Sequence, residues 1–290
     1  MQKKNNLICE NCGVSSEERN KLKSNKKGDV SEFGSYPQTI KKEVVTIINT
    51  IQDENGYFTG SDGEKYALIK ANPWYAEGVY SSDVFSNGEK IIKNKEYYFK
   101  VEPIKWKVLE EDNNELFLFS KLLLDTHIFD NKSNDYSLSS IRIWLNNDFY
   151  NKAFTDNEKS LIISKTIDTE KNVYEPYGYK VISESLIDKI FILSKDDITN
   201  KSYGFNNNND KCKKVTDYAK ANGAWEKVVD YDIANGVWKS EESPNGWYWL
   251  RNPWSYDDVA GIGGDGCIYK GYVDDKGSGV APALVINKIK

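Results

Sequence analysis

The sequence is poor in histidine and arginine. It contains a single histidine, His127, and its only arginines are Arg19, Arg142 and Arg251. One histidine cannot build a histidine-based metal site, and a Ser-His-Asp triad would depend on His127 alone. The sequence also contains no P-loop and no dinucleotide-binding fingerprint. An enzyme is therefore the less favoured interpretation.

Long apolar runs and an excess of basic residues are missing as well. No stretch reaches the roughly 18 apolar residues that a membrane-spanning helix needs. The net charge of −5 argues against nucleic-acid binding, which needs a basic face. The first six residues include lysines, but no apolar segment follows them. The sequence as given therefore predicts no signal peptide and a cytoplasmic location.

The four cysteines do not form a recognisable set. Cys9 and Cys12 make a C-x-x-C motif, which is half of a zinc ribbon, whereas Cys212 and Cys267 stand alone. The motif lies in residues 1–30, which are polar and lack apolar periodicity, so we expect a disordered tail there and a single domain over residues 31–290. Two interpretations of the motif remain open: a reduced pair in that tail, or a zinc site completed by distant residues or another chain.

Aromatic residues are abundant, at 13% of the chain with 8 Trp, 19 Tyr and 11 Phe. Such an excess belongs in a core, in a binding surface, or in both.

Two helices are predicted in the middle of the chain. Residues 139–150 place Ile141, Trp144 and Phe149 on one face, with Ser139 or Ser140 as the cap. Residues 155–164 begin with a capping box, because a threonine cap is followed three residues later by Glu158. Residues 41–51 also show helical spacing and predict a shorter helix.

Strands are predicted on both sides of these helices. Residues 103–109 alternate, with Ile104, Trp106 and Val108 on one face, and residues 116–120 return as a hairpin. Residues 188–194 form a short apolar strand. The C-terminal part is a β-meander with strands at residues 246–251, 259–262, 267–273 and 280–286. The fold class is therefore α+β, with an antiparallel sheet, two central helices and a C-terminal β-meander.

Several segments occur in the order of a known family. They are FGSYPQ (33–38), PIKWKVL (103–109), IRIWLN (141–146), DKIFILS (188–194), WLR (249–251) and GVAPAL (279–284). With them, residues 32–288 resemble a large bacterial family described as a domain of unknown function. That family is distantly similar to the C-type lectin-like fold, which variable ligand-binding proteins and formylglycine-generating enzymes share. Ala281 stands where many members have Arg, and Asn252 where Ser is usual, so any role of those side chains is lost here.

The candidate ligand-binding residues lie near the C-terminus. Trp254, Tyr256, Asp257 and Asp258 follow Pro253 in a predicted loop, and Tyr269 and Tyr272 lie on a meander strand. Aromatic rings can stack on a ligand, and carboxylates accept hydroxyl or amine donors. We therefore expect a non-catalytic domain that binds a carbohydrate or a protein at this surface, the alternative being an ordinary exposed loop.

The remaining candidates are structural or concern other functions. The residues that we expect to support the fold are Trp106, Trp144, Trp249, Arg142 and Arg251. No cofactor is expected, although calcium is conceivable at the acidic residues Asp257, Asp258, Asp265, Asp274 and Asp275. Two alternative functions stay open: an enzyme of the formylglycine-generating type that uses Cys267 or these carboxylates, and a scaffold protein whose C-x-x-C recruits zinc or a partner.

Overall fold

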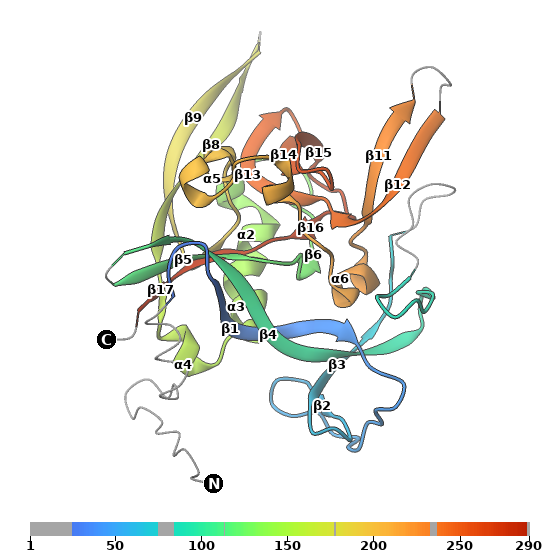
Figure 1. Cartoon of the computed structure of the whole chain (residues 1–290). Coiled ribbons are helices and arrows are strands. Elements are labelled where there is room, and N and C mark those ends of the chain that lie inside the picture. The colour runs from blue at the N-terminus through green and yellow to red at the C-terminus, as the bar shows by residue number, and fades with distance from the viewer. Residues whose placement is uncertain (1–24, 75–83, 113, 177, 233–236, 289–290) are drawn as a thin grey trace.

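The computed structural model describes residues 25–74, 84–112, 114–176, 178–232 and 237–288. Within residues 227–232 and 237–243 it describes the backbone alone. Strands dominate, nearly all strand pairs are antiparallel, and short helices lie between them (Figure 1). The predicted mixed α+β class is thus confirmed. One cluster of buried apolar side chains extends from Phe33 to Ile286 and joins both main sheets. Within these ranges, no helix is long and apolar enough to cross a membrane.

The larger sheet has eight strands. Its main order is β10-β17-β5-β4-β3-β2, with β1 beside β4 and β7 beside β17. Its strands are β1 (Val30–Ile40), β2 (Phe58–Thr59), β3 (Lys65–Lys70), β4 (Glu96–Glu111), β5 (Glu115–Ser120), β7 (Ile162–Ile163), β10 (Ile190–Phe191) and β17 (Ala283–Asn287). Residues before β1 already pair with β4, because Gly28 N donates to Val108 O and Val108 N donates to Asp29 O.

The predicted alternation in β4 is confirmed. Ile104, Trp106 and Val108 are fully buried, and the Trp106 Nε1 donates to the carbonyl of Phe33 at 2.7 Å. Beside it, Gly34 has a φ of +69°, and a Cβ there would lie 2.5 Å from the Phe154 ring. Only glycine combines this backbone conformation with so close an approach.

The smaller sheet contains the C-terminal meander. Its order is β15-β14-β13-β16-β6, and its strands are β6 (Asp125–Thr126), β13 (Tyr248–Ser255), β14 (Asp258–Ile262), β15 (Ile268–Tyr272) and β16 (Gly279–Val280). The predicted closing strand is divided: β16 pairs with β13 and β6, and β17 crosses to the larger sheet. Pro282 separates the two parts and cannot donate a ladder hydrogen bond. The closing segment therefore ties the two sheets together.

Two further hairpins stand apart from these sheets. They are β8 (Lys165–Glu175) with β9 (Gly178–Asp188), and β11 (Glu226–Asp232) with β12 (Val237–Gly246). Both extend away from the body of the molecule on the same side (Figure 1).

The helical segments are short. They are η1 (Tyr136–Leu138), α2 (Ser140–Trp144), η2 (Leu145–Phe149), α3 (Tyr150–Ala153), α4 (Asp156–Lys159), α5 (Lys195–Thr199), η3 (Lys201–Tyr203), η4 (Asn208–Lys211) and α6 (Asp217–Asn222). The first predicted central helix is confirmed: α2, the π-helical η2 and α3 are continuous, and Ser139 caps their start.

The second predicted helix is wrong in its extent. The capping box of Thr155 and Glu158 is present, but α4 ends at Lys159. Ile162 and Ile163 then pair with β17 as β7. The sheet offers these β-branched residues a strand partner and buries the Ile162 side chain.

The short helix predicted over residues 41–51 is also wrong. This stretch consists of turns and bends with one isolated β-bridge, from Ile47 to Gly60. Val44, on the predicted apolar face, is 85% exposed. A helix this short is stabilised only by packing, and Val44, Ile48 and Ile51 are left exposed by the part of the chain that the structure describes.

One buried lysine lacks a carboxylate partner among the described residues. Lys213 is 6% exposed, its Nζ donates to the carbonyl of Ser120, and the same Nζ lies 3.6 Å from the centre of the Phe119 ring. Burial holds the pKa of Lys213 well below its usual value, and the positive charges of Lys107 and Lys121 lower it further. The unfolded chain therefore binds more protons than the fold does in the pH range below 10.5.

We expect Lys213→Met to stabilise the protein more at pH 7 than at pH 9.5. In that range the wild-type free energy of unfolding should rise with pH, by at most about 1.4 kcal/mol per unit from this group, and the variant lacks this dependence. Urea unfolding at both pH values measures the difference. Lys201→Met, at an exposed lysine, is the control. If the free energies of unfolding of the variant and the wild type differ by the same amount at both pH values, Lys213 stays protonated in the folded protein.

Candidate functional site

The β8–β9 hairpin presents one polar and aromatic face. The strands pair in continuous register from Lys165 with Asp188 to Glu175 with Gly178. Because side chains alternate along a strand, every second residue shares a face with its cross-strand partner. That face carries the pairs Asp168 with Ser185, Glu170 with Ser183, and Tyr174 with Tyr179. The opposite face turns Ile167 and Thr169 toward the body, where both are buried.

A buried arginine joins this hairpin to β13 and α5. Arg251 donates from Nε to the carbonyl of Asp168 at 2.8 Å, and from Nη1 to the carbonyl of Ile192 at 2.9 Å. Its Nη1 also forms an ion pair with Asp197 at 2.7 Å. Asp197 in turn completes the capping box that Ser194 begins at the start of α5. Arg251 thus contacts three separate segments, and the structural role expected of it stays a prediction.

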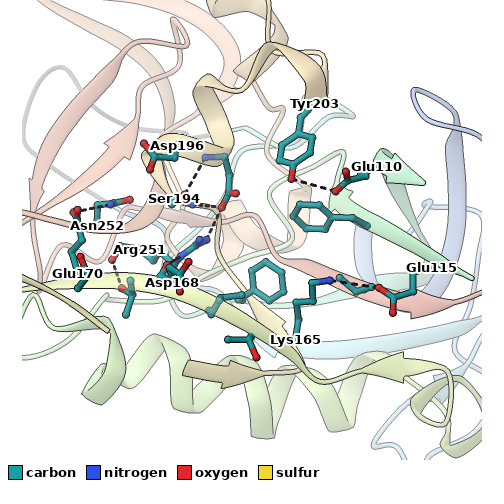
Figure 2. Close-up of a pocket in the computed structure, with 18 of the residues that line it drawn as sticks. Glu110, Glu115, Lys165, Asp168, Glu170, Ser194, Asp196, Tyr203, Arg251 and Asn252 are labelled. Carbon is teal, nitrogen blue, oxygen red and sulfur yellow. Dashed lines mark hydrogen bonds and ion pairs between the residues drawn. The ribbon is translucent and has the colours of Figure 1, made fainter. Parts of the chain in front are cut away.

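A cavity of about 530 Å³ lies between the hairpin, β5, β13 and α5 (Figure 2). Its carboxylates are Glu110, Asp112, Glu115, Asp168, Glu170, Asp196 and Asp197, and its cations are Lys165 and Arg251. Aromatic rings line one part of it: Phe117 lies 5.8 Å from Phe191 and 5.5 Å from Tyr203, centre to centre. The cavity is thus acidic with an aromatic side.

Four exposed aromatic side chains gather beside this cavity. This aromatic cluster consists of Tyr174, Tyr179, Trp254 and Tyr256. The rings of Tyr174 and Tyr256 stack at 5.4 Å with an interplanar angle of 11°. Tyr179 OH donates to the carbonyl of Trp254 at 3.4 Å. The Lys195 Nζ lies 4.4 Å from the centre of the Trp254 ring.

Tyr256 has a backbone conformation that is rare for its type. Its φ is +43°, in the left-handed region that bulky residues seldom adopt. Its carbonyl accepts hydrogen bonds from Asn134 Nδ2, at 2.5 Å, and from the Tyr174 hydroxyl. These contacts hold a strained residue whose side chain is 66% exposed. Such strain is concentrated at functional sites in folded proteins.

The other predicted ligand residues occupy different environments. Asp257 is exposed next to Tyr256, whereas Asp258 is buried and pairs with Lys270 at 2.7 Å. Tyr269 and Tyr272 are both exposed on β15, and Tyr269 OH donates to Asp265 at 2.8 Å. Neither tyrosine makes a ring contact with the aromatic cluster within the described part of the chain. The structure therefore brings Trp254 and Tyr256 together with hairpin residues, and a binding role for all six residues stays a prediction.

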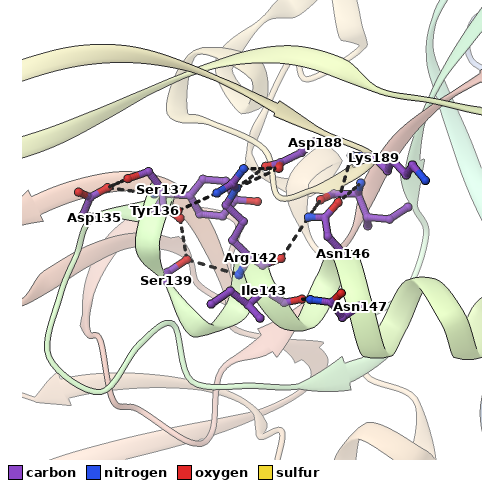
Figure 3. A network of polar contacts seen from close by, with 11 residues as sticks. Asp135, Tyr136, Ser137, Ser139, Arg142, Ile143, Asn146, Asn147, Asp188 and Lys189 are labelled. Carbon is purple, nitrogen blue, oxygen red and sulfur yellow. Dashed lines mark hydrogen bonds and ion pairs between the residues drawn. The ribbon is translucent and has the colours of Figure 1, made fainter.

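The tryptophans and Arg142 predicted to be structural lie in or against the core. Trp106 and Trp249 are buried, and Trp144 packs against the core while stacking on His127 at 5.2 Å. Arg142 pairs with Asp188 through Nη2 at 2.7 Å and donates from Nη1 to the carbonyl of Ser137 (Figure 3).

Asn146 extends this network toward the end of the hairpin. Its Oδ1 accepts from the backbone N–H groups of Lys189 and Ile190, and its Nδ2 donates to the Ile190 carbonyl (Figure 3). The central helix thus fixes the position of the chain where β9 ends and β10 begins.

Tyr174, Tyr179 and Lys195 were not predicted as site residues from the sequence. The segment YEPYG at residues 174–178 has the composition of a turn between strands, which was the available signal. Recognising that turn would have predicted the hairpin, and cross-strand pairing would then have placed Tyr174 opposite Tyr179.

The cysteine and metal alternatives receive no support from geometry. Cys212 and Cys267 both approach Asn208, since Cys212 Sγ donates to its carbonyl at 3.5 Å and Asn208 Nδ2 donates to Cys267 Sγ at 3.0 Å. Burial raises the pKa of both thiols, which disfavours the nucleophilic thiolate. In the described part of the chain, no three or more Asp, Glu, Cys or His residues could hold a metal ion. Cys9 and Cys12 lie outside it.

Comparison with known proteins identifies one family. No curated protein and no solved structure matches the chain. A family model described as "Domain of unknown function (DUF6273)" matches residues 113–288, a shorter span than the predicted 32–288, and the FGSYPQ and PIKWKVL segments lie before it. Because the match covers more than half of the chain, the protein belongs to the DUF6273 family of domains of unknown function.

Proposed function

We propose that the protein is a non-catalytic binding domain that holds a protein ligand on the aromatic cluster. The stacking of Tyr256 on Tyr174 in a strained but exposed position is the observation that carries this proposal. Tyrosine and tryptophan supply large contact areas at low entropic cost, and they are enriched in protein interfaces. The four aromatic side chains come from two segments that are distant in sequence, and their contacts hold them in place before a ligand binds, which favours a preorganised surface.

The C-type lectin-like architecture is a further part of the proposal. Its support is the helical segment between two sets of strands, the meander β13-β14-β15, and one core cluster that is consistent with a single domain over residues 31–290. One detail departs from that fold, in which the closing strand is joined to the start of the chain: here β17 pairs with β5, β7 and β10, whereas β1 pairs with β4.

The test is binding to peptide and glycan arrays by the wild type and by a Trp254→Ala, Tyr256→Ala double variant. We expect the wild type to bind a set of peptides, and the double variant to lose at least about tenfold in affinity, since a central interface aromatic typically contributes more than 1 kcal/mol. Circular dichroism should show that the variant stays folded.

The matched control removes another aromatic pair. Phe58 and Tyr98 are half-buried and lie 5.5 Å apart on β2 and β4. Figure 1 shows β2 at the opposite end of the molecule from the tip of the β8–β9 hairpin. A Phe58→Ala, Tyr98→Ala variant should bind like the wild type. Binding that survives in the cluster variant would place the site elsewhere, and binding to glycans alone would replace the protein ligand by a carbohydrate.

A further inference from the structure

The cavity beside the hairpin has an unbalanced charge. Of its seven carboxylates, Glu115 pairs with Lys165 at 3.5 Å and Asp197 with Arg251 at 2.7 Å. For the other five, Glu110, Asp112, Asp168, Glu170 and Asp196, no lysine or arginine nitrogen of the described residues lies within ion-pair distance. Like charges held around one cavity raise its affinity for a counter-charge.

Several carboxylates also keep an oxygen available. Glu170 accepts from Asn252 Nδ2 through Oε2 at 3.1 Å, and Glu110 accepts from Tyr203 through Oε2 at 3.4 Å (Figure 2). Asp168 accepts from the Ser185 hydroxyl through Oδ1 at 2.8 Å. These bonds fix the orientation of each carboxylate, and the described residues donate no hydrogen bond to its second oxygen. A ligand with several N–H donors can therefore reach preoriented acceptors.

The aromatic side of the cavity suits a cation as well. The Phe117, Phe191 and Tyr203 rings lie together opposite the hairpin carboxylates, and a cation near a ring face is attracted by its quadrupole. An anionic ligand would face repulsion from the carboxylates, and a purely apolar one would bury them without a partner.

The strands that line the cavity also carry the aromatic cluster further along the chain. Glu170 and Tyr174 lie on the same face of β8, four residues apart, which corresponds to about 13 Å at the rise of a strand. Lys195 lies between them, since its Nζ is over Trp254 and its charge interacts with those of Glu170 and Asp196. An extended peptide of about four residues spans this distance.

We propose that this cavity binds the guanidinium or ammonium group of an arginine or lysine in the protein ligand, about four residues from the residue that contacts the aromatic cluster. This inference rests on the proposed function. The carboxylates supply the charge and the acceptors, the rings supply the cation–π surface, and the hairpin sets the spacing. The cavity then selects for a basic residue at one position of the ligand.

The test uses N-acetyl-arginine amide and its neutral counterpart N-acetyl-citrulline amide as probes. Amide NMR shifts of residues 165–170, followed during titration, report binding in the cavity. We expect saturable binding of the arginine probe and binding about tenfold weaker for citrulline, because charge-assisted hydrogen bonds are roughly twice as strong as neutral ones. A Glu170→Gln, Asp196→Asn variant should weaken arginine binding about tenfold and leave citrulline unchanged.

The controls separate this inference from the proposed function. Asp257→Asn also removes an exposed carboxylate, but outside the cavity, and should leave arginine binding unchanged. The Trp254→Ala, Tyr256→Ala variant should keep arginine binding while losing the peptides. Equal affinity for arginine and citrulline, no saturable shift, or full binding by the Glu170→Gln, Asp196→Asn variant would overturn the cationic site. Failure of the cluster variant to lose peptides would overturn the proposed function and leave the cavity result standing.

Discussion

Arg251→Met is expected to lower the free energy of unfolding by about 3–5 kcal/mol, because it removes a buried charge from the half-buried Asp197 carboxylate and leaves two backbone carbonyls without their donor. The side chains of Arg251 and Asp197 are only 6% and 20% exposed. The substitution also removes the two hydrogen bonds that the carbonyls of Asp168 and Ile192 accept from Arg251. Chemical unfolding of the purified variant measures the loss directly.

A surface ion pair is the matched control for this experiment. Lys95 and Glu89 lie 2.9 Å apart, but their side chains are 47% and 42% exposed. Lys95→Met should therefore have little effect on the free energy of unfolding. If Arg251→Met does not fold, Arg251→Lys keeps the charge and gives a measurable loss. A loss below about 1 kcal/mol for both Arg251 variants would contradict the role assigned to this pair.

Trp249→Ala should also cost about 3–5 kcal/mol, because it empties a core position. The Trp249 side chain is 1% exposed, its ring lies 4.9 Å from that of Trp247, and its Nε1 donates to the carbonyl of His127 at 2.8 Å. Truncation removes both the packing and this hydrogen bond. Thermal and urea unfolding should both show the loss.

Trp254→Ala on the same strand is the control. Trp254 is 38% exposed, and the Lys195 side chain covers one face of its ring. Its truncation should change the free energy of unfolding by less than about 1 kcal/mol, since little buried volume is lost. Equal losses at the two positions would mean that Trp254 is as much a core residue as Trp249, and would weaken its assignment to a binding surface.

These predictions connect stability with the candidate site. Arg251 is the contact that links β13, α5 and the hairpin, and all three border the cavity. A conservative change at Arg251 can therefore alter binding in the cavity while the protein remains folded. A change at Trp249 acts on the core beneath the smaller sheet, where it affects binding only through stability.

Local sequence signals determined several elements of this fold. Ser139 begins the central helix as expected, because a serine hydroxyl satisfies a free backbone N–H group at that end. Gly223 ends α6 with a φ of +119°, which glycine adopts readily. The alternation of Ile104, Trp106 and Val108 placed one face of β4 in the core.

Other elements depended on contacts distant in sequence. Residues 41–51 have helical spacing, but the described residues leave Val44, Ile48 and Ile51 exposed. Ile162 and Ile163, in contrast, follow a well-capped helix and pair as a strand with β17. Neither outcome is encoded locally, since short helices owe most of their stability to tertiary packing.

The candidate site shows the same division. The sequence by itself determined that Tyr256 follows a strand and that the chain carries an excess of acidic and aromatic residues. Trp254, which was predicted in the same loop, lies on β13 instead. Only the tertiary structure decided that Tyr174 stacks on Tyr256 and that Asp168 and Glu170 share a cavity with Glu110 and Asp196. The physical reason is that a side chain's neighbours across a hairpin or between sheets are set by register and by the packing of distant segments.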